Sequence, residues 1–494
     1  MKPFARLPLV AASSLMAAGL LHAGVVDKSY RDARAVLDAG IKAAGGLEAL
    51  RAIKEVRWVG SGTAYAQGQS LVPETLITRQ VEVTSDIDLA GGRSRTETVT
   101  SGTGIVTGRT VAVLNGEQSF GYNIVTRALT PTGAGAVAAG RTGLRRNPAA
   151  LLLTALGRAE TLRSLGPRAI TFSDTDGTQI GLTFDAAGLL ASQETLADNA
   201  VLGDALTELV FSEYRDVPVG SARVKLPGRV VTRVAGDTTL DIKYSKIEAN
   251  MGLAAATLAA PPNAERVTPA PAVPGGIAVT KLGDDAYLIG GGSHHSLAVG
   301  FKDGVTVVEA PLSDERSLAV LAKVNELFPG KSIRLVPTHY HFDHSGGIRT
   351  YVAWGLPILT TPGNKGFIEK MAATPHTIRP DTLSKDPKKP NIETFTGKKV
   401  ISDGTRTLEL YDVGPNPHVK EMVIAYLPKE KTLFVADLIS LNPGPFAPAA
   451  PALVDFSEKI GKLGLAVDVL VPAHGRQGTM EDLKAALAAK AAND

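Results

Sequence analysis

A short histidine-rich motif in the second half of the chain combines four residues that commonly bind metal ions. It reads His339-Tyr-His341-Phe-Asp343-His344 and follows an apolar run at residues 333–336 that is typical of a buried strand. His339 and His341 are two residues apart, so in an extended chain their side chains point the same way and can share one cation, while the last two residues turn toward a second position. Two cations held roughly 3.5–4 Å apart can share a hydroxide, lower its pKa and polarise the bond that it attacks, so the motif predicts metal-assisted hydrolysis.

One loop cannot complete two such sites, so further ligands are expected downstream. Three candidates each follow an apolar stretch: His418 in Gly414-Pro-Asn-Pro-His418, Asp437 after residues 431–436, and His474 in Val-Pro-Ala-His474-Gly. Each lies where a predicted strand meets a loop, and open sheets place their sites at such junctions. A lone loop histidine is usually solvated, and Asp437 could instead cap the segment that follows it. The need for a third imidazole favours metal binding for His418, and the apolar strand before Asp437 favours metal binding there.

The cysteine count narrows the possible chemistry. The 494 residues include nine histidines and no cysteine. This excludes disulfides, thiol nucleophiles, iron–sulfur clusters and thiolate metal ligands. Lys and Arg number 52 against 49 Asp and Glu, and a net charge of +3 is too small to favour a nucleic-acid or membrane-surface partner. Histidines and carboxylates must therefore carry any metal or acid–base chemistry, and the expected partner is a small-molecule substrate.

The beginning of the chain is typical of an export signal. Lys2 and Arg6 precede an uncharged apolar stretch at residues 7–21, and the small residue Ala23 suits a cleavage site. About 15 apolar residues are fewer than the ~20 that span a bilayer, although an uncleaved anchor is the alternative. We therefore predict a signal peptide at residues 1–24, a periplasmic or secreted protein, and no stable membrane insertion after cleavage.

The stretch after the signal changes from helical to strand-like periodicity. Apolar residues recur at helical spacing over residues 30–53 until Gly45-Gly46 interrupts them. From about residue 56 to residue 255, short alternating segments such as 79–84 and 239–244 are separated by turn signals. We expect residues 25–257 to form a β-rich antiparallel domain, shaped like a half-open barrel, with a leading helix and a second helix near residues 148–156.

This N-terminal arrangement loosely resembles periplasmic lipoprotein-carrier barrels, including its Leu226-Pro-Gly228 entry to the late strands. The resemblance implies that the region could bind a hydrophobic ligand or a partner protein. A plain apolar core explains the same alternation. Five prolines at residues 258–276 then predict a stiff linker, which leaves residues 277–494 as a second domain. That domain should contain a helix at residues 313–327 before the histidine motif.

From about residue 276 onward, the chain resembles the metallo-β-lactamase-fold superfamily of dinuclear metal hydrolases. The resemblance implies an αββα sandwich with the site at one edge. It also implies that Asp343 orients the nucleophile as well as binding metal. The implied ligands are His339, His341 and His418 for the first metal, Asp343, His344 and His474 for the second, and Asp437 as the bridge between them. Zinc is the expected ion because most ligands are imidazoles, and the two carboxylates leave room for iron or manganese.

Asp437 marks a departure from the dedicated lactam-hydrolysing branches of that superfamily. One of their classes has Cys at this position and another has Ser, whereas Asp is shared with the glyoxalase II, lactonase and phosphodiesterase branches. The chain is therefore expected to act on an ester, lactone, thioester or related bond, with β-lactam hydrolysis as an alternative. The superfamily also serves diiron redox chemistry in flavodiiron proteins, but no flavodoxin-like domain follows here.

Four further residues are ambiguous. His294 and His295 lie in a Gly-rich hairpin loop, where they could edge the active-site mouth or serve as simple turn residues. His376 lies in the basic segment 362–399, which could form a lid that favours anionic substrates or could be a solvated surface. Tyr340 alternates with the metal-facing histidines and should point away from the metals, so it is given no catalytic role.

Overall fold

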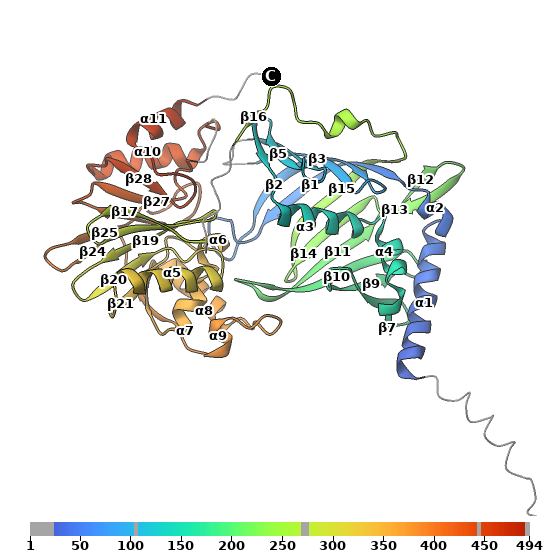
Figure 1. Cartoon of the computed structure of the whole chain (residues 1–494), viewed down its shortest axis with the longest axis horizontal. Coiled ribbons are helices and arrows are strands. Elements are labelled where there is room, and N and C mark those ends of the chain that lie inside the picture. Colours follow the sequence, from blue (N-terminus) through green and yellow to red (C-terminus); the bar gives the residue numbers. More distant parts are fainter. Residues whose placement is uncertain (1–23, 103–106, 268–275, 442–445, 490–494) are drawn as a thin grey trace, which may run out of the picture.

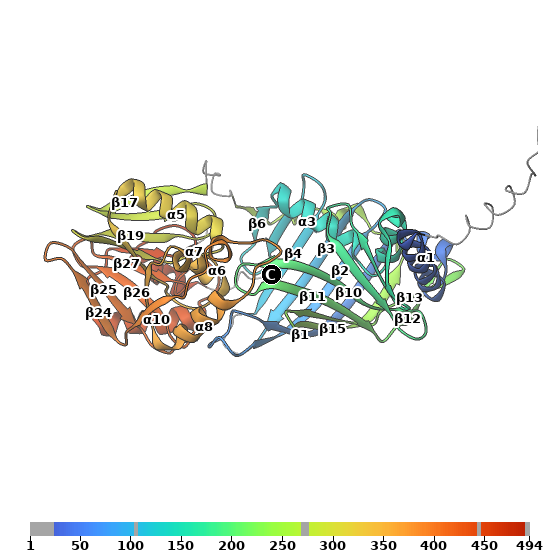
Figure 2. The same ribbon diagram turned by 90° about the horizontal axis from the view of Figure 1, so that it is seen from below.

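The computed structural model describes residues 24–102, 107–267, 276–441 and 446–489. An N-terminal β-sheet domain and a C-terminal domain of two sheets and several helices lie side by side along the long axis of the molecule (Figures 1 and 2). The predicted signal peptide lies, except for its last residue, outside the described residues. Among the described residues, no helix is both long and apolar enough to cross a bilayer.

The N-terminal domain is built on one curved sheet of 14 strands, in the order β16-β6-β5-β4-β3-β2-β1-β15-β14-β11-β10-β9-β8-β7. All neighbouring strands of this sheet are antiparallel except β16 and β6, which pair in parallel. The strands are β1 Glu55–Ala66, β2 Ile77–Asp88, β3 Arg93–Ser101, β4 Gly108–Leu114, β5 Phe120–Asn123, β6 Ala128–Pro131, β7 Arg163–Gly166, β8 Ala169–Ser173, β9 Gln179–Phe184, β10 Leu190–Asn199, β11 Gly203–Ser212, β14 Arg229–Val234, β15 Asp237–Ala249 and β16 Glu265–Arg266, and a separate hairpin consists of β12 Arg215–Val219 and β13 Ala222–Leu226. The prediction of a β-rich antiparallel domain is confirmed.

Four helices accompany this sheet: α1 Val25–Ala43, α2 Leu47–Arg51, α3 Ala134–Arg145 and α4 Leu151–Gly157. The break between α1 and α2 falls at the predicted Gly45-Gly46, where both glycines have positive φ. Helix α1 buries Ala33, Leu37 and Ile41 in the core, together with apolar residues of α4, β8 and β9. Figure 1 shows α1 at the end of the domain that lies away from the C-terminal domain.

The expected linker begins as part of this domain. Residues 255–258 form a short 3-10 helix whose Leu258 is buried, and β16 pairs with β6. The structure describes the linker as far as residue 267 and again from residue 276.

The C-terminal domain has two sheets, ordered β17-β18-β19-β20-β21-β22-β23 and β24-β25-β26-β27-β28. Helices α5, α7, α8 and α9 lie beside the first sheet, and α10 and α11 beside the second (Figure 1). The strands are β17 Ala278–Gly283, β18 Ala286–Gly290, β19 Ser296–Gly300, β20 Gly304–Val308, β21 Ser332–Val336, β22 Pro357–Thr360, β23 Asn391–Thr394, β24 Lys398–Ser402, β25 Thr407–Asp412, β26 Val423–Leu427, β27 Thr432–Ala436 and β28 Val469–Pro472. The helices are α5 Asp314–Leu327, α6 Phe342–Ser345, α7 Ile348–Ala353, α8 Pro362–Ala373, α9 Thr382–Lys385, α10 Pro451–Leu463 and α11 Met480–Ala488. This is the predicted αββα sandwich.

Alternation along single strands builds this sandwich. In β19, Leu297 and Val299 join the core between the two sheets, whereas Ala298 faces the cluster formed with α5 and α7. Both faces of the strand are therefore buried, and β19 is apolar apart from its first residue and the closing glycine. The first sheet packs against helices on one face and against the second sheet on its other face. This is possible because its inner strands are apolar on both faces.

Two hairpins of the N-terminal sheet reach the C-terminal domain (Figure 1). The loop at residues 67–76, between β1 and β2, lies beside α6, and its contacts are described below. The turn between β10 and β11 meets the segment that follows α8: Asp204 accepts the backbone N–H of Thr377 at 2.8 Å, and His376 Nδ1 lies 2.8 Å from Asp198 Oδ1. His376 is thus an interface residue.

Candidate metal centre

The seven predicted metal ligands come together at one edge of the sandwich. His339 and His341 follow β21, and Asp343 and His344 lie in α6, the single turn that comes next. The other three ligands lie just beyond strands of the second sheet: His418 in the loop between β25 and β26, Asp437 after β27, and His474 after β28. The strand ends of both sheets meet at this edge, which places residues up to 135 positions apart within one cluster.

The first group of potential ligands consists of His339, His341, His418 and Asp437, whose donor atoms all lie within 4.8 Å of one another. His418 Nε2 is 3.4 Å from His339 Nε2 and 3.5 Å from Asp437 Oδ2. His341 Nε2 is hydrogen-bonded to the carbonyl of Ser70, at 3.0 Å, so its Nδ1 is the nitrogen left for the centre. These contacts reproduce the set that the sequence assigns to the first metal, with Asp437 beside it.

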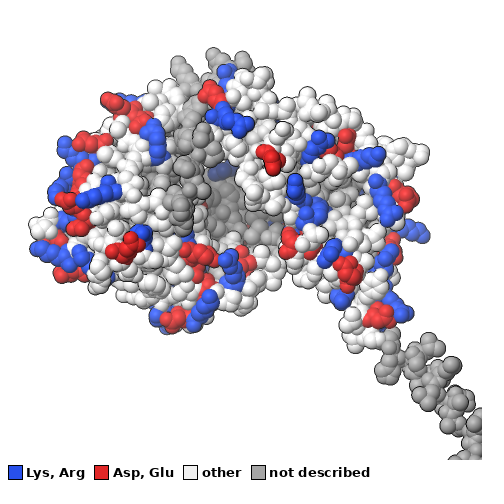
Figure 3. All heavy atoms as spheres, viewed as in Figure 1, with Lys and Arg blue, Asp and Glu red and all other residues white. Residues whose placement is uncertain are grey.

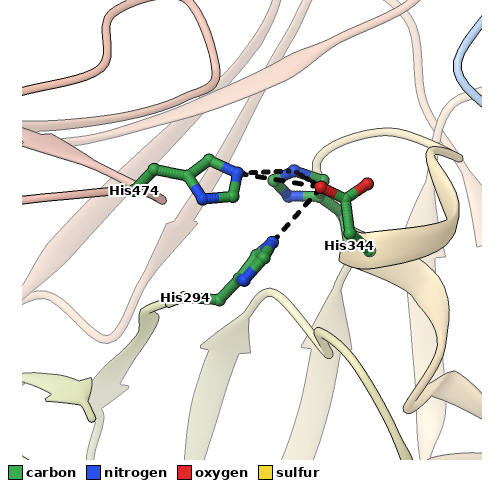
Figure 4. A group of neighbouring side chains, drawn as sticks. His294, His344 and His474 are labelled. Atoms are coloured by element: carbon green, nitrogen blue, oxygen red, sulfur yellow. Dashed lines mark hydrogen bonds and ion pairs between the residues drawn. The ribbon is translucent and has the colours of Figure 1, made fainter. Parts of the chain in front are cut away.

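The second group consists of Asp343, His344 and His474, joined by His294. Figure 4 shows the rings of His294, His344 and His474 converging from two loops and the short helix α6. His474 Nε2 is 3.4 Å from His344 Nε2, and His294 Nε2 is 3.3 Å from Asp343 Oδ2. His294 is 4% exposed, so it is a buried member of the cluster and not a simple turn residue.

Asp437 lies between the two groups. One of its carboxylate oxygens is 3.0 Å from His344 Nε2 and 3.5 Å from His418 Nε2, and the other is 3.3 Å from His474 Nε2. A single carboxylate therefore touches imidazoles of both groups. This is the position that a bridging ligand requires.

Glu309 fixes the orientation of the imidazoles from behind. It follows β20, is fully buried, and lies with its Oε2 2.9 Å from His344 Nδ1. Its other oxygen accepts the hydroxyl of Thr338, and that hydroxyl is also 2.9 Å from His339 Nδ1. A carboxylate behind a ligating histidine fixes its tautomer and makes it a stronger ligand. Glu309 therefore aims the Nε2 atoms of His344 and His339 into the cluster.

The surroundings of His339 and His341 favour their neutral forms, which are the forms that bind metal. Burial, together with the neighbouring histidines His344 and His341, holds the pKa of His339 well below the usual histidine value. Burial and the nearby His418 lower the pKa of His341 to about 3. Both rings are therefore neutral near pH 7, as metal ligands must be.

The carboxylates are held in their ionised forms. Burial alone would raise the pKa of Asp437, but the charge on His344 and the close imidazoles of His418 and His474 hold it well below the usual range. Burial also opposes ionisation of Asp343, and its contacts with His294, His344 and Gln69 outweigh that effect and lower its pKa. Conversely, burial would lower the pKa of His344, but Glu309 and Asp437 raise it well above the usual value. A cation bound here would displace the proton of His344.

The donor set fits divalent metal ions. Within the described residues, two buried atoms of the cluster, His341 Nδ1 and Asp437 Oδ1, have no hydrogen-bond partner. Buried polar atoms are normally satisfied, and a cation in each group would supply the missing partner. His339, His341 and His418 would hold one ion and Asp343, His344 and His474 the other, with Asp437 shared. The mostly imidazole donors suit zinc, and the carboxylates also suit iron or manganese.

Three residues near the centre were not assigned from the sequence. Glu309 could have been found as a carboxylate that directly follows a buried apolar strand, and its φ of 80° marks an unusual backbone position. His294 was left open between active-site mouth and turn. Gln69 donates from Nε2 to Asp343 Oδ1 at 2.7 Å, and no local pattern connects two residues that are 274 positions apart.

The remaining open residues take structural positions. Tyr340 is buried, and its hydroxyl donates to the carbonyl of Val72 at 3.0 Å and not to a group of the cluster, while His295 Nε2 is bonded to the carbonyl of Gly475 at 2.6 Å. Several basic side chains of segment 362–399 form ion pairs with carboxylates: Lys365 with Glu369, Arg379 with Glu315, Lys398 with Glu409, and Lys399 with Glu393. The basic side chains of these pairs are thus occupied by carboxylates, while His376 and Thr377 of the same segment contact the N-terminal domain.

Comparison with known proteins identifies the C-terminal fold. Residues 289–474 match the family model of the metallo-beta-lactamase superfamily, so this part of the chain carries the metallo-β-lactamase fold. A comparison with curated proteins gave no match. Similar solved structures include a metallo-beta-lactamase from Pontibacter korlensis, with 24% identity over 43% of this chain and 97% of that one and a TM-score of 0.33. The DIM-1 metallo-beta-lactamase is 18% identical over 43% of this chain and 95% of that one, with a TM-score of 0.34.

Proposed function

We propose that the protein is an exported hydrolase that depends on two divalent metal ions and acts on an ester, lactone, thioester or related bond. The observation that carries this proposal is the position of Asp437, which touches imidazoles of two separate ligand groups within one buried cluster. The superfamily match over residues 289–474 supports the hydrolase class. When bound, two such ions supply a hydroxide nucleophile near neutral pH and polarise the bond under attack.

The side chains of this chain hold the centre in a reactive geometry. Seven residues would hold the two ions, Glu309 and Thr338 orient two of the imidazoles, and burial keeps bulk water away from His339 and His344, which are fully buried. Asp343 is 34% exposed at its side chain, so it is the ligand that can meet both substrate and nucleophile. Its ionised carboxylate can accept a hydrogen bond from the attacking group and so orient it.

The substrate class follows from the site and its surroundings. Asp at position 437, where lactam-hydrolysing branches have Cys or Ser, favours ester-like bonds over lactams. On the face shown in Figure 3, acidic and basic side chains are interspersed over both domains, and the surface is hollowed between them. This charge distribution favours a small-molecule substrate over a polyanion such as a nucleic acid. β-Lactams belong in any substrate test, because the superfamily includes enzymes that hydrolyse them.

A carrier role for the N-terminal domain is the alternative from another functional class. That domain contains a cavity of about 240 Å³, lined by Arg95, Val111, Phe120, Tyr122, Ile124, Arg127, Ala259, Pro261 and Asn263. Pockets for drug-sized ligands measure roughly 300–1,000 Å³. This cavity is smaller than that range, so hydrolysis is the better-supported activity.

The proposal is tested with the full chain, loaded with zinc, on lactone, ester, thioester, phosphodiester, sulfate ester and lactam substrates. Replacing Asp343 and His344 together with Ala should abolish turnover of any substrate found. Losing several kcal/mol of transition-state stabilisation corresponds to a fall of about a thousandfold or more. The control is Asp468→Asn, an exposed residue paired with Lys431 away from the centre. Turnover like that of the wild type in the double variant would overturn the assignment.

A further inference from the structure

A loop of the N-terminal domain reaches the metal centre of the C-terminal domain. The loop connects β1 and β2 at residues 67–76 and lies beside α6 (Figure 1). The superfamily match begins only at residue 289, so this loop lies outside the matched fold. Its contacts with the centre are therefore a feature of this two-domain chain.

Gln69 of this loop holds one oxygen of a proposed metal ligand. Its Nε2 donates to Asp343 Oδ1 at 2.7 Å. The other oxygen, Oδ2, faces the imidazoles: it is 3.3 Å from His294 Nε2 and 3.6 Å from His344 Nε2. With Oδ1 engaged by an amide, Oδ2 is the oxygen presented to the second metal position.

Ser70, the next residue of the loop, orients a proposed ligand of the first metal. The carbonyl of Ser70 lies 3.0 Å from His341 Nε2, so that nitrogen carries the proton and donates it. His341 Nδ1 then faces the cluster as an acceptor, and it is one of the two buried atoms without a hydrogen-bond partner. The loop backbone therefore selects the tautomer in which His341 can bind a metal.

The loop is fixed in place by several bonds to the C-terminal domain. The hydroxyl of Tyr340 donates to the carbonyls of Ser70 and Val72, and the backbone N–H of Lys420 donates to the carbonyl of Leu71 at 2.8 Å. The backbone N–H of Phe342 donates to Gly68 O at 3.2 Å.

The loop packs tightly against the histidine motif at Gly68. Its φ is +67°, and a Cβ added there would lie 2.3 Å from ring atoms of Phe342. Only glycine fits this position, so the approach of the loop to the histidine motif depends on it.

We propose that the N-terminal domain completes the metal centre, with Gln69 as a positioning residue for Asp343 and the Ser70 carbonyl as the group that orients His341. This inference rests on the proposed dinuclear function. It assigns the N-terminal domain a part in building the site, apart from any ligand that the domain itself binds.

The test measures the two metal dissociation constants of the full chain by competition with a chromophoric chelator. Gln69→Ala removes the amide, and Gln69→Met keeps the length and volume of the side chain without a donor. Both variants should bind the second zinc ion about 10- to 100-fold more weakly and the first ion normally, since Gln69 contacts only Asp343 among the proposed ligands. The control is Gln67→Ala, two residues away, whose amide bonds to Asp237 within the N-terminal sheet.

The outcomes separate the two proposals. If the wild type binds fewer than two ions, the dinuclear function fails. If the wild type binds two ions and Gln69→Met binds both as tightly, the positioning role is wrong. Equal weakening in Gln67→Ala would also contradict it, because the loss would then come from general disturbance of the loop. Thermal unfolding of each metal-free variant reports whether it folds, and a variant that unfolds at the wild-type temperature yet loses only the second ion supports the inference.

Discussion

Glu309 contacts two ligand-bearing residues without belonging to the proposed ligand set. It is fully buried, accepts the hydroxyl of Thr338 and pairs with His344 Nδ1. A glutamine at this position has one acceptor oxygen and one donor nitrogen, so it can satisfy only one of these two donors. The loss of one bond lets an imidazole rotate or change tautomer.

We therefore expect Glu309→Gln to weaken zinc binding by about 10- to 100-fold, measured by chelator competition on the full chain. The matched control is Glu326→Gln, an exposed glutamate on α5 that pairs with Lys323. Unchanged affinity in Glu309→Gln would show that Glu309 does not orient the ligands.

For individual residues, the sequence predicts those site residues that lie close together in the chain. The spacing of His339, His341, Asp343 and His344 predicts a metal site because four ligands fall within six residues. Gln69 and His294 contact the same cluster, but their partners lie 274 and 49 positions away in the chain. No spacing rule reaches that far, because the contact exists only once two domains and two loops have packed together.

Among the elements, the helix predicted at residues 313–327 matches α5. Helix α5 begins after Ser313, whose hydroxyl accepts the backbone N–H of Arg316, as expected for an N-cap. Helix α3 was not expected, since its sequence contains three glycines and none of its residues is buried. A helix that contributes little to the core leaves little apolar periodicity to detect.

One buried ion pair holds together the elements that follow the histidine motif. Arg349 of α7 is 3% exposed and bonds to both oxygens of Asp381, the N-cap of α9, and to the carbonyls of Met371 and Thr374. The same segment carries Thr377 to the β10–β11 turn. The pair therefore supports both the sandwich and the domain interface.

Asp381→Asn should lower the free energy of unfolding by about 3–5 kcal/mol, because it leaves the charge of Arg349 buried without a partner. Urea denaturation of the metal-free chain measures this change. In the control, Lys399→Ala removes an exposed pair with Glu393 and should cost no more than about 1 kcal/mol. Similar small losses in both variants would contradict a structural role for the buried pair.

For the whole molecule, the division into a β-rich part and an αββα part follows from the periodicity of the chain. The strand order of the N-terminal sheet does not, since β1 pairs with both β2 and β15, which lie at opposite ends of the domain sequence. The relation between the domains is likewise set by long-range contacts of two hairpins. These contacts place a loop of the first domain against the metal centre of the second.

The central claim is that this centre holds two metal ions, and anomalous diffraction from crystals of the zinc-loaded full chain tests it most directly. We predict two anomalous peaks roughly 3.5–4 Å apart. One should lie among His339, His341 and His418, the other among Asp343, His344 and His474, with Asp437 in contact with both. A single peak, or two peaks with Asp437 bound to neither, would contradict the account.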